Sequence, residues 1–210
     1  MKKEFNVMPG MLNDQNFYGF DWLEHVTAVP QPLVLVTGYK NNGKQNATMQ
    51  SWLSFSNNNG FYCIFSNVCK FTHMYEVATN QKQLVINFLT AENYKRCYST
   101  IANNGYDTDE LDVAGLRSKP ATKINAPIVE DCPLNLECEY VWKKEISENS
   151  AYVVLCVKIV NIHMDDSLYK QGRYAKTDIY IIYIRRLIRK QESVTTRQSE
   201  SLKLTKPTMK

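Results

Sequence analysis

Short apolar runs separated by polar turns dominate the first half of the chain. An apolar run predicts a buried strand over residues 33–39, and the polar segment 41–44 predicts a hairpin-type connection after it. A second strand is expected within residues 45–55. The turn sequence 57–60 then leads to an almost wholly apolar third strand over residues 61–65.

Capping residues mark a set of short helices. Helices are expected over residues 22–26, 72–79, 91–103 and 108–114. Asp21 and Thr72 are the expected N-caps of the first two, because their side-chain oxygens can accept from unpaired helical N–H groups. Gly115 stands where a left-handed residue ends the last helix.

Further strand patterns surround and follow these helices. Residues 83–89 form an apolar run, and residues 134–140 alternate as on a half-buried antiparallel strand. The segment 151–162 is more continuously apolar, so burial on both faces is expected, with 143–150 as the hairpin between them. Residues 179–184 are a last strand candidate. Along the chain, strands are followed by inserted helices and then by strands again. This order favours a mainly β fold, an antiparallel barrel with helical insertions, over a parallel α/β sheet.

Length and composition fit one soluble domain. The chain has 210 residues, 44% of them hydrophobic, which is enough for a single sizeable core. No apolar run is long enough to span a bilayer, and the first residues lack the apolar stretch of a secretory signal. A cytoplasmic protein with no membrane partner is therefore expected.

The positive charge is concentrated at the C-terminus. Residues 185–210 contain eight Lys or Arg and two Glu, a charge of +6, so the rest of the chain carries −2 of the net +4. We expect one domain over residues 1–184 and a basic, flexible tail over 185–210. A solvated terminus is favoured over a segment that binds nucleic acid or a membrane surface.

Common catalytic signatures are missing from the sequence. It contains no GxGxxG fingerprint, no P-loop and no nucleophile elbow. Its three histidines follow no zinc spacing, so no metal site is expected. Reduced thiols are expected at all six cysteines, which are Cys63, Cys69, Cys97, Cys132, Cys138 and Cys156.

Three segments carry candidate binding chemistry. Residues 46–52 are rich in hydroxyl and amide groups and end in an indole, so they can hydrogen-bond a flat polar ring and pack on its face. Residues 66–73 combine two hydroxyls, an ammonium and helical N–H groups, which suits a phosphate, although a helix cap beside a surface lysine explains them equally well. Asn87 is an amide within an apolar strand, where a structural hydrogen bond is favoured over a ligand.

These segments resemble the flavin reductase-like FMN-binding split-barrel family, particularly its flavoredoxin-type branch. The resemblance runs from Trp22 to Met164 and depends on the order and spacing of several motifs. These are PLVLVTGYKNNGKQNATMQSW, SNVCKFTHMYEV and QLVINFL, extended by CYSTIANNGYDTDELDVAGL and APIVEDCPLNLECEY.

The resemblance implies a homodimeric, six-stranded antiparallel split barrel with FMN near the dimer interface. It implies roles for individual residues: Asn46, Ala47, Thr48 and Met49 line the isoalloxazine, Ser51 and Trp52 complete that wall, Ser66, Lys70 and Thr72 hold the phosphate, Asn87 lies beneath the ring, and Lys176 reaches the flavin. For Trp52, an ordinary core aromatic remains the alternative.

The chain departs from the family pattern in two places, at Glu110 and beyond Met164, where the likeness fades although residues 172–177 resemble a motif of some relatives. Glu110 stands where relatives often carry a lysine, and the missing cation would weaken contact with the anionic side of a flavin or shift its potential. Cys97 falls where relatives often carry a cysteine, but a core thiol explains it equally well.

The resemblance implies an FMN-dependent oxidoreductase that receives hydride from NADH or NADPH. No residue is assigned a catalytic role, because the hydride chemistry belongs to the cofactors. Two alternatives stay open. One is an electron carrier reduced by a partner protein, and the other is a barrel that binds no flavin and acts as a binding module, with nucleic acid the disfavoured ligand.

Overall fold

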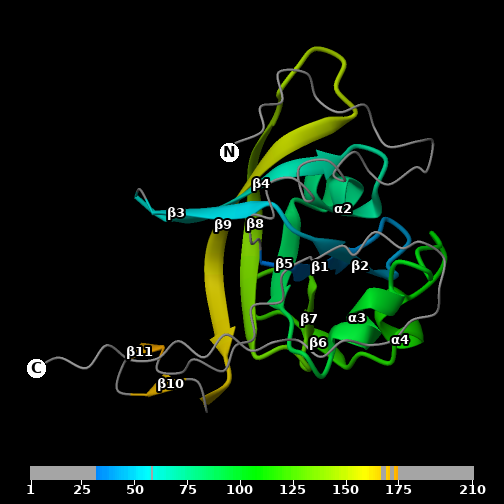
Figure 1. The fold of residues 1–210 in the computed structure, drawn as a ribbon, viewed down its shortest axis with the longest axis vertical. Helices are drawn as coiled ribbons and strands as arrows, with labels where there is room; N and C mark the ends of the chain where they lie inside the picture. Colours follow the sequence, from blue (N-terminus) through cyan, green and yellow to red (C-terminus); the bar gives the residue numbers. More distant parts are fainter. Residues whose placement is uncertain (1–31, 58, 167–168, 171–172, 175–210) are drawn as a thin grey trace, which may run out of the picture.

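The computed structural model describes residues 32–57, 59–166, 169–170 and 173–174. Its main feature is a seven-stranded antiparallel sheet in the order β2-β1-β5-β8-β9-β4-β3 (Figure 1). The strands are β1 (Val34–Tyr39), β2 (Gln45–Gln50), β3 (Leu53–Asn57), β4 (Phe61–Cys69), β5 (Gln83–Phe88), β8 (Leu134–Glu145) and β9 (Tyr152–Met164).

The two edges of this sheet are joined by only two residues. β2 and β3 lie at opposite ends of the strand order, yet β2 ends at Gln50 and β3 begins at Leu53. The sheet must therefore curl until its edges approach, which makes it a split barrel. Trp52 forms the junction with a left-handed backbone (φ 60°), and its carbonyl oxygen accepts the Ser66 N–H at 2.8 Å.

The inward faces of the strands enclose the main hydrophobic core. Helix α2 (His73–Glu76) and the π-helical turn η1 (Val77–Gln81) add Met74, Val77 and Ala78 to this core. Gly38 on β1 permits the close approach, because a Cβ there would lie 2.3 Å from Val77 Cγ1. The antiparallel ladder and the turn thus hold α2 against β1 and β2.

A second apolar cluster covers the other face of β1 and β2. It joins Leu35 and Ala47 to Cys97 of helix α3 (Tyr94–Ser99) and Leu111 of helix α4 (Glu110–Val113). A small sheet of β6 (Ser118–Pro120) and β7 (Pro127–Val129) follows α4, and a two-stranded sheet of β10 (Tyr169–Lys170) and β11 (Arg173–Tyr174) follows β9. β2 therefore lies between α2 on one side and α3 with α4 on the other.

The predicted fold class is confirmed, with two differences in detail. The main sheet has seven strands instead of six, and the strand expected within 45–55 is broken at Trp52 into β2 and β3. The helices expected over 91–103 and 108–114 are shorter than expected, whereas the one expected over 72–79 forms as α2 followed directly by η1. The predicted ends are confirmed at two of them, since the Thr72 hydroxyl accepts the Tyr75 N–H and Gly115 after α4 has φ 65°.

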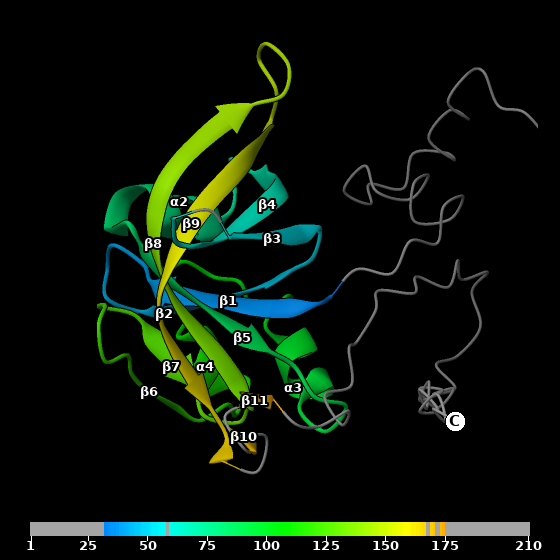
Figure 2. The ribbon, with the colours of Figure 1, turned by 90° about the vertical axis from the view of Figure 1, so that its left-hand side faces the viewer.

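The expected burial of the two long strands is partly wrong. β8 does not alternate, because residues 135–138 are all buried. The polar residues Asn135 and Glu137 are buried by hydrogen bonds to β7 and to the β6–β7 connection. β9 is buried at Leu155 and Val157 but exposed at Lys158. The C-terminal end of β8 and the N-terminal end of β9 form a hairpin arm that extends beyond the sheet (Figure 2).

Several expectations fall outside the residues that the structure describes. These are the helix at 22–26, the strand at 179–184, Lys176 and the tail at 185–210. The division into a domain over residues 1–184 and a tail therefore stays a prediction. Within the described part of the chain, no helix is both long and apolar enough to cross a membrane.

Candidate functional site

The alternation of β2 divides the expected ring-binding wall between two faces. Ala47 and Met49 belong to the outer apolar cluster with Tyr94 of α3. Asn46 and Thr48 point to the opposite face, where the Asn46 amide lies 3.3 Å from the Thr48 hydroxyl. A flat ring cannot contact both sets of side chains at once. Both sets of side chains lie next to the same edge of β2, the edge that faces away from β1.

Two carboxylates from α4 close the first half of this edge. The Gln45 N–H donates to Asp109 Oδ2 at 3.4 Å, and the Ala47 N–H donates to Glu110 Oε2 at 2.8 Å. In an antiparallel ladder alternate residues turn their N–H groups outward, so Met49 presents its N–H on the same side. Among the described residues no side chain closes the edge at Met49 in this way, so the Met49 N–H is the candidate for a ligand contact.

Glu110 is one partner of a buried ion pair. Lys40 Nζ lies 3.0 Å from Glu110 Oε1, and both side chains are 0% exposed. The ammonium also donates to the carbonyl oxygens of Gly105 and Thr108, at 2.8 and 2.7 Å. All three of its protons are thus used. A cation does stand beside Glu110, but it is committed within the protein and cannot contact a flavin.

α2 adds polar atoms that have no partner among the described residues. His73 Nδ1 is buried and lies 3.4 Å from Glu110 Oε1 without forming a hydrogen bond, and Glu76 Oε1, one turn further on, is also buried and unpaired. Tyr106 contacts the His73 ring edge-on, with ring centroids 5.8 Å apart. Buried polar atoms of this kind need a partner, and a polar ligand beside β2 would supply one.

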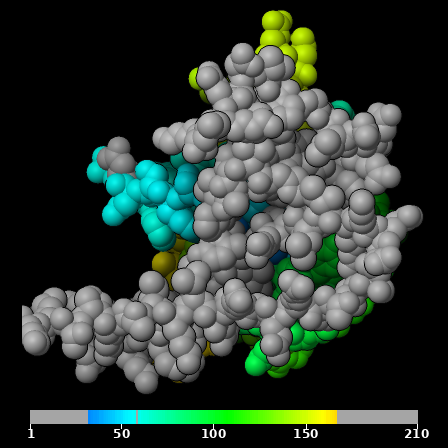
Figure 3. Space-filling view, viewed as in Figure 1, coloured from blue at the N-terminus to red at the C-terminus, as the bar shows by residue number. Residues whose placement is uncertain are grey.

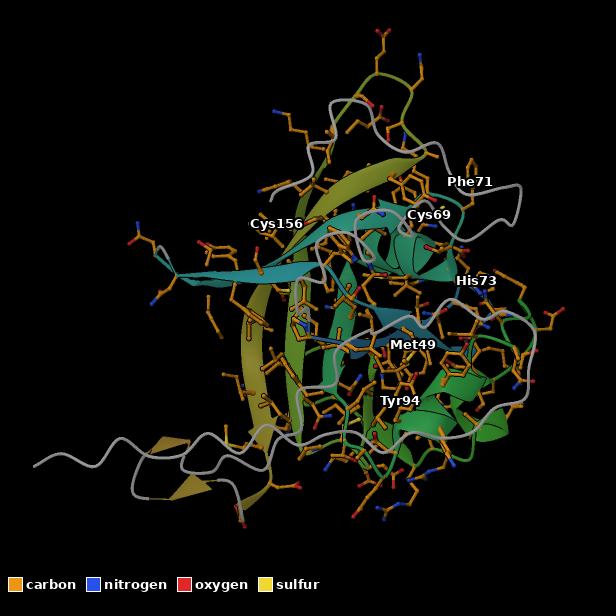
Figure 4. All side chains as sticks on the ribbon, in the orientation of Figure 1. Met49, Cys69, Phe71, His73, Tyr94 and Cys156 are labelled. Carbon is orange, nitrogen blue, oxygen red and sulfur yellow. The ribbon has the colours of Figure 1, made fainter. Side chains whose placement is uncertain are left out.

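Three of the residues labelled in Figure 4 show how these elements lie around β2. Figure 4 shows His73 at the start of α2, with Met49 on β2 and Tyr94 on α3 on the other side of the strand. Sequence reasoning missed Lys40 and Glu76 and named His73 only as the end of a motif. Its position directly after the Thr72 cap was the available signal.

The segment expected to hold a phosphate contacts the C-terminal end of the segment expected to line the ring. The Ser66 N–H reaches the Trp52 carbonyl, and the Gln50 amide donates to the Asn67 carbonyl at 3.3 Å. Lys70 instead pairs with Glu145 of the β8 arm. The Thr72 hydroxyl donates to the Cys69 carbonyl at 2.8 Å while capping α2. A phosphate would have to displace Glu145 from Lys70.

The Asn87 side chain makes the structural hydrogen bonds that are favoured for an amide within an apolar strand. Its amide donates to the Leu35 carbonyl at 2.9 Å and the Thr37 hydroxyl at 3.0 Å, and its oxygen accepts from Val129 N–H and the Asn135 amide. The side chain is fully buried and its hydrogen bonds stay within the protein. Asn87 therefore joins β5 to β1, β7 and β8.

Five of the six cysteines are buried, and Cys69 is partly exposed. All six are free, and Cys97 is buried on α3. A side-chain hydrogen bond between Cys132 and Cys97, together with burial, raises the pKa of Cys132 far above its usual range, and burial raises the pKa of Cys63 to about 12. Within the described residues no cluster of three or more His, Cys, Asp or Glu could hold a metal ion.

A polar pocket lies away from these residues. It has a volume of about 510 Å³ and is lined by residues that include Arg117, Lys119, Asn135 and His163. None of the expected ligand-binding residues lines it, so it plays no part in the arrangement around β2.

Sequence comparison identifies the family. A model of the family described as "Flavin reductase like domain" matches residues 26–178, well over half of the chain. The protein belongs to the flavin reductase-like family. Membership supports a flavin-related oxidoreductase function, and the orphaned polar atoms beside the β2 edge fit a polar ring system such as a flavin.

Solved structures share the split-barrel fold. Nitrilotriacetate monooxygenase component B from Bacillus cereus has a TM-score of 0.68 and 22% identity, covering 81% of this chain and 88% of that one. Flavoredoxin of Desulfovibrio vulgaris (Miyazaki F) has a TM-score of 0.68 and 17% identity, covering 94% and 99%. A sequence relative matches a shorter part of the chain. This relative, an uncharacterized protein of Methanothermobacter thermautotrophicus, is 27% identical over 89 residues, which are 41% of this chain and 42% of that protein's own length.

Proposed function

We propose that this protein is an FMN-dependent oxidoreductase that accepts hydride from NADH or NADPH. The observation that carries the proposal is the half-open edge of β2. Its first N–H groups are taken by Asp109 and Glu110, its remainder runs toward the left-handed Trp52, and the His73 ring, whose Nδ1 faces Glu110, lies beside it. Family membership supports a flavin as the ligand.

Different residues of this edge would make different contacts with the ligand. The backbone of Met49 and Ser51 would hydrogen-bond the polar edge of the ring, and Trp52 would pack against it. Asn46, Ala47 and Thr48 would support the strand from its two faces. Bound flavin would supply the hydride chemistry, and the chain would supply orientation and exclusion of water.

A phosphate site at the end of β4 completes the proposal. Ser66 lies next to Trp52, and Lys70 and Thr72 follow it toward α2. Lys70 would exchange Glu145 for the phosphate, while Thr72 would contribute through the turn that it caps. Lys176 remains a proposed ligand contact from the segment outside the described residues.

We propose that the protein acts as a homodimer. β3 is an edge strand, and its Phe55 stacks on Phe61 of β4 with ring centroids 5.7 Å apart. Both rings are about 40% exposed. The β3–β4 hairpin protrudes at one side of the molecule in the space-filling view (Figure 3). An exposed aromatic pair at a sheet edge is typical of a surface that another protein copy covers.

Spectroscopy of the purified protein tests the proposal. An FMN-loaded protein should show the flavin absorbance band, and anaerobic addition of NADH or NADPH should bleach it at catalytic rates. Absence of bleaching with both nucleotides would contradict the reductase and favour an electron carrier reduced by a partner protein. A protein that stays colourless after incubation with excess FMN would exclude both flavin functions.

A further inference from the structure

His73 is the one member of the buried Lys40–Glu110–His73 cluster whose polar atoms are not already committed. Lys40 donates all three protons, and Glu110 accepts from Lys40 and from the Ala47 N–H. His73 Nδ1 faces Glu110 Oε1 at 3.4 Å without a hydrogen bond. Imidazole is also the side chain that changes charge between about pH 5 and 8. His73 can therefore gain a proton without breaking a buried bond.

The orientation of the His73 ring determines which of its nitrogens faces Glu110 and which can face a ligand. Nδ1 is buried, whereas 20% of the His73 side chain is exposed, so its exposed part lies on the other ring atoms. The edge-on contact with Tyr106 fixes the plane of the ring. A buried carboxylate that faces one ring nitrogen orients the other toward a bound molecule.

The charges around His73 come from four elements. They are Lys40 at the end of β1, Glu110 on α4, Glu76 on α2 and the phenol of Tyr106 in the loop before α4. Lys40 and Glu110 cancel each other. The Asp109 carboxylate, which accepts from the Gln45 N–H and side-chain amide, adds a negative charge at the start of β2. The protonation of His73 therefore changes the net charge beside β2.

We propose that His73 is the proton-carrying residue of the ligand site along β2, an inference that rests on the proposed function. In its charged form Nδ1–H donates to Glu110, and Nε2–H is presented to the polar edge of the flavin ring. Hydride transfer breaks one C–H bond of the reduced nicotinamide and brings one proton and two electrons to the flavin, which gains one negative charge. A proton from the His73 imidazolium balances that charge, and the imidazole then regains a proton from water.

The test compares the wild type with His73→Gln, both full-length and loaded with FMN. Glutamine places an uncharged amide near the position of Nε2, so a donor remains while the titration is lost. His163→Gln is the matched control, because His163 is 27% exposed and also contacts a fully buried carboxylate, Glu137. The readout is the midpoint potential of the bound flavin across about pH 5–8.

The expected result is specific to His73. His73→Gln should lose about tenfold in its binding preference for reduced over oxidised FMN, which lowers the two-electron potential by ~30 mV. Its potential should also depend less on pH than that of the wild type. His163→Gln should match the wild type in both respects.

The outcomes separate the inference from the function on which it rests. A wild type that does not bind FMN contradicts the proposed function. A wild type that binds FMN, together with a His73→Gln variant of unchanged potential and pH dependence, overturns the role of His73 alone. If the variant does not fold, NMR spectra of the wild-type imidazoles decide. FMN should shift the ring resonances of His73 and leave those of His163 unchanged, and unshifted His73 resonances overturn the inference.

Discussion

Lys40 Nζ lies 3.0 Å from Glu110 Oε1, and neither side chain is exposed to solvent. The two residues are 70 positions apart in the sequence. Through them the end of β1 is tied to α4, and through the second Glu110 oxygen α4 is tied to the edge of β2. The pair thus sets how much of that edge a ligand can reach.

Lys40→Met should destabilise the fold strongly. Removing the ammonium leaves the Glu110 charge buried without a partner, and breaking such a pair from one side costs about 3–5 kcal/mol. Urea unfolding of the wild type and the variant measures this loss.

The double variant Lys40→Met/Glu110→Leu provides the control. It removes both charges, so it should be more stable than Lys40→Met alone even though the Ala47 N–H loses its acceptor. Equal stability of the single and double variants would show that burial of the unpaired carboxylate is not what destabilises Lys40→Met.

Glu137 should make stability depend on acid pH. Burial raises the pKa of this carboxyl, but donation from the Thr122 N–H, His163, the Lys123 N–H and the Asn161 amide lowers it by more, so the net pKa is below the ordinary value of 4.5. A lowered pKa means that its stabilisation is present above the unfolded value and is lost as pH falls through the folded value. Glu137→Gln should cost about 2–3 kcal/mol at neutral pH.

The pH series supplies the check on Glu137. Unfolding free energies of the wild type and Glu137→Gln should converge as the pH falls below 4.5 and through the lowered pKa of the folded state, because the wild-type carboxyl is then protonated as well. A difference that stays constant until the wild type unfolds in acid would contradict a stabilising role for the charge.

Because of the left-handed backbone at Trp52, its glycine and alanine variants should show an unusual order of stability. Its φ of 60° disfavours every side chain with a Cβ, whereas glycine adopts it freely. Trp52→Gly and Trp52→Ala both lose the indole, so the glycine variant should be the more stable by about 1 kcal/mol. At Ser54 in the regular part of β3, the same pair of substitutions should show the opposite order. Thermal unfolding of the four variants measures both differences.

The sequence predicted the strands because their apolar periods are long and uninterrupted, and it predicted Thr72 and Gly115 because capping chemistry is local. It missed the break at Trp52, since neither glycine nor proline stands there to indicate a turn. Lys40 follows a strand and precedes a polar turn, where lysine is ordinarily exposed. Its burial arises only when the loop at Gly105 and Thr108 folds over it, which is a long-range contact that no local pattern reveals.

Lys70 gives a direct test of the proposed phosphate site. Lys70→Ala should weaken FMN binding by about 1.5–3 kcal/mol and leave riboflavin binding nearly unchanged, because only FMN carries the phosphate. Thr72→Ala should weaken FMN in the same way but also destabilise the fold by about 1 kcal/mol, since Thr72 caps α2. Fluorescence titration with both ligands separates these effects.

Glu145→Gln is the matched variant for this site. Glu145 pairs with Lys70, so removing its charge should free the ammonium and tighten FMN binding while riboflavin binding stays the same. The direction is opposite to that of Lys70→Ala, although both substitutions break the same ion pair. If both variants weaken FMN equally, the ion pair itself, rather than Lys70 as a phosphate ligand, supports binding, and the phosphate site lies elsewhere.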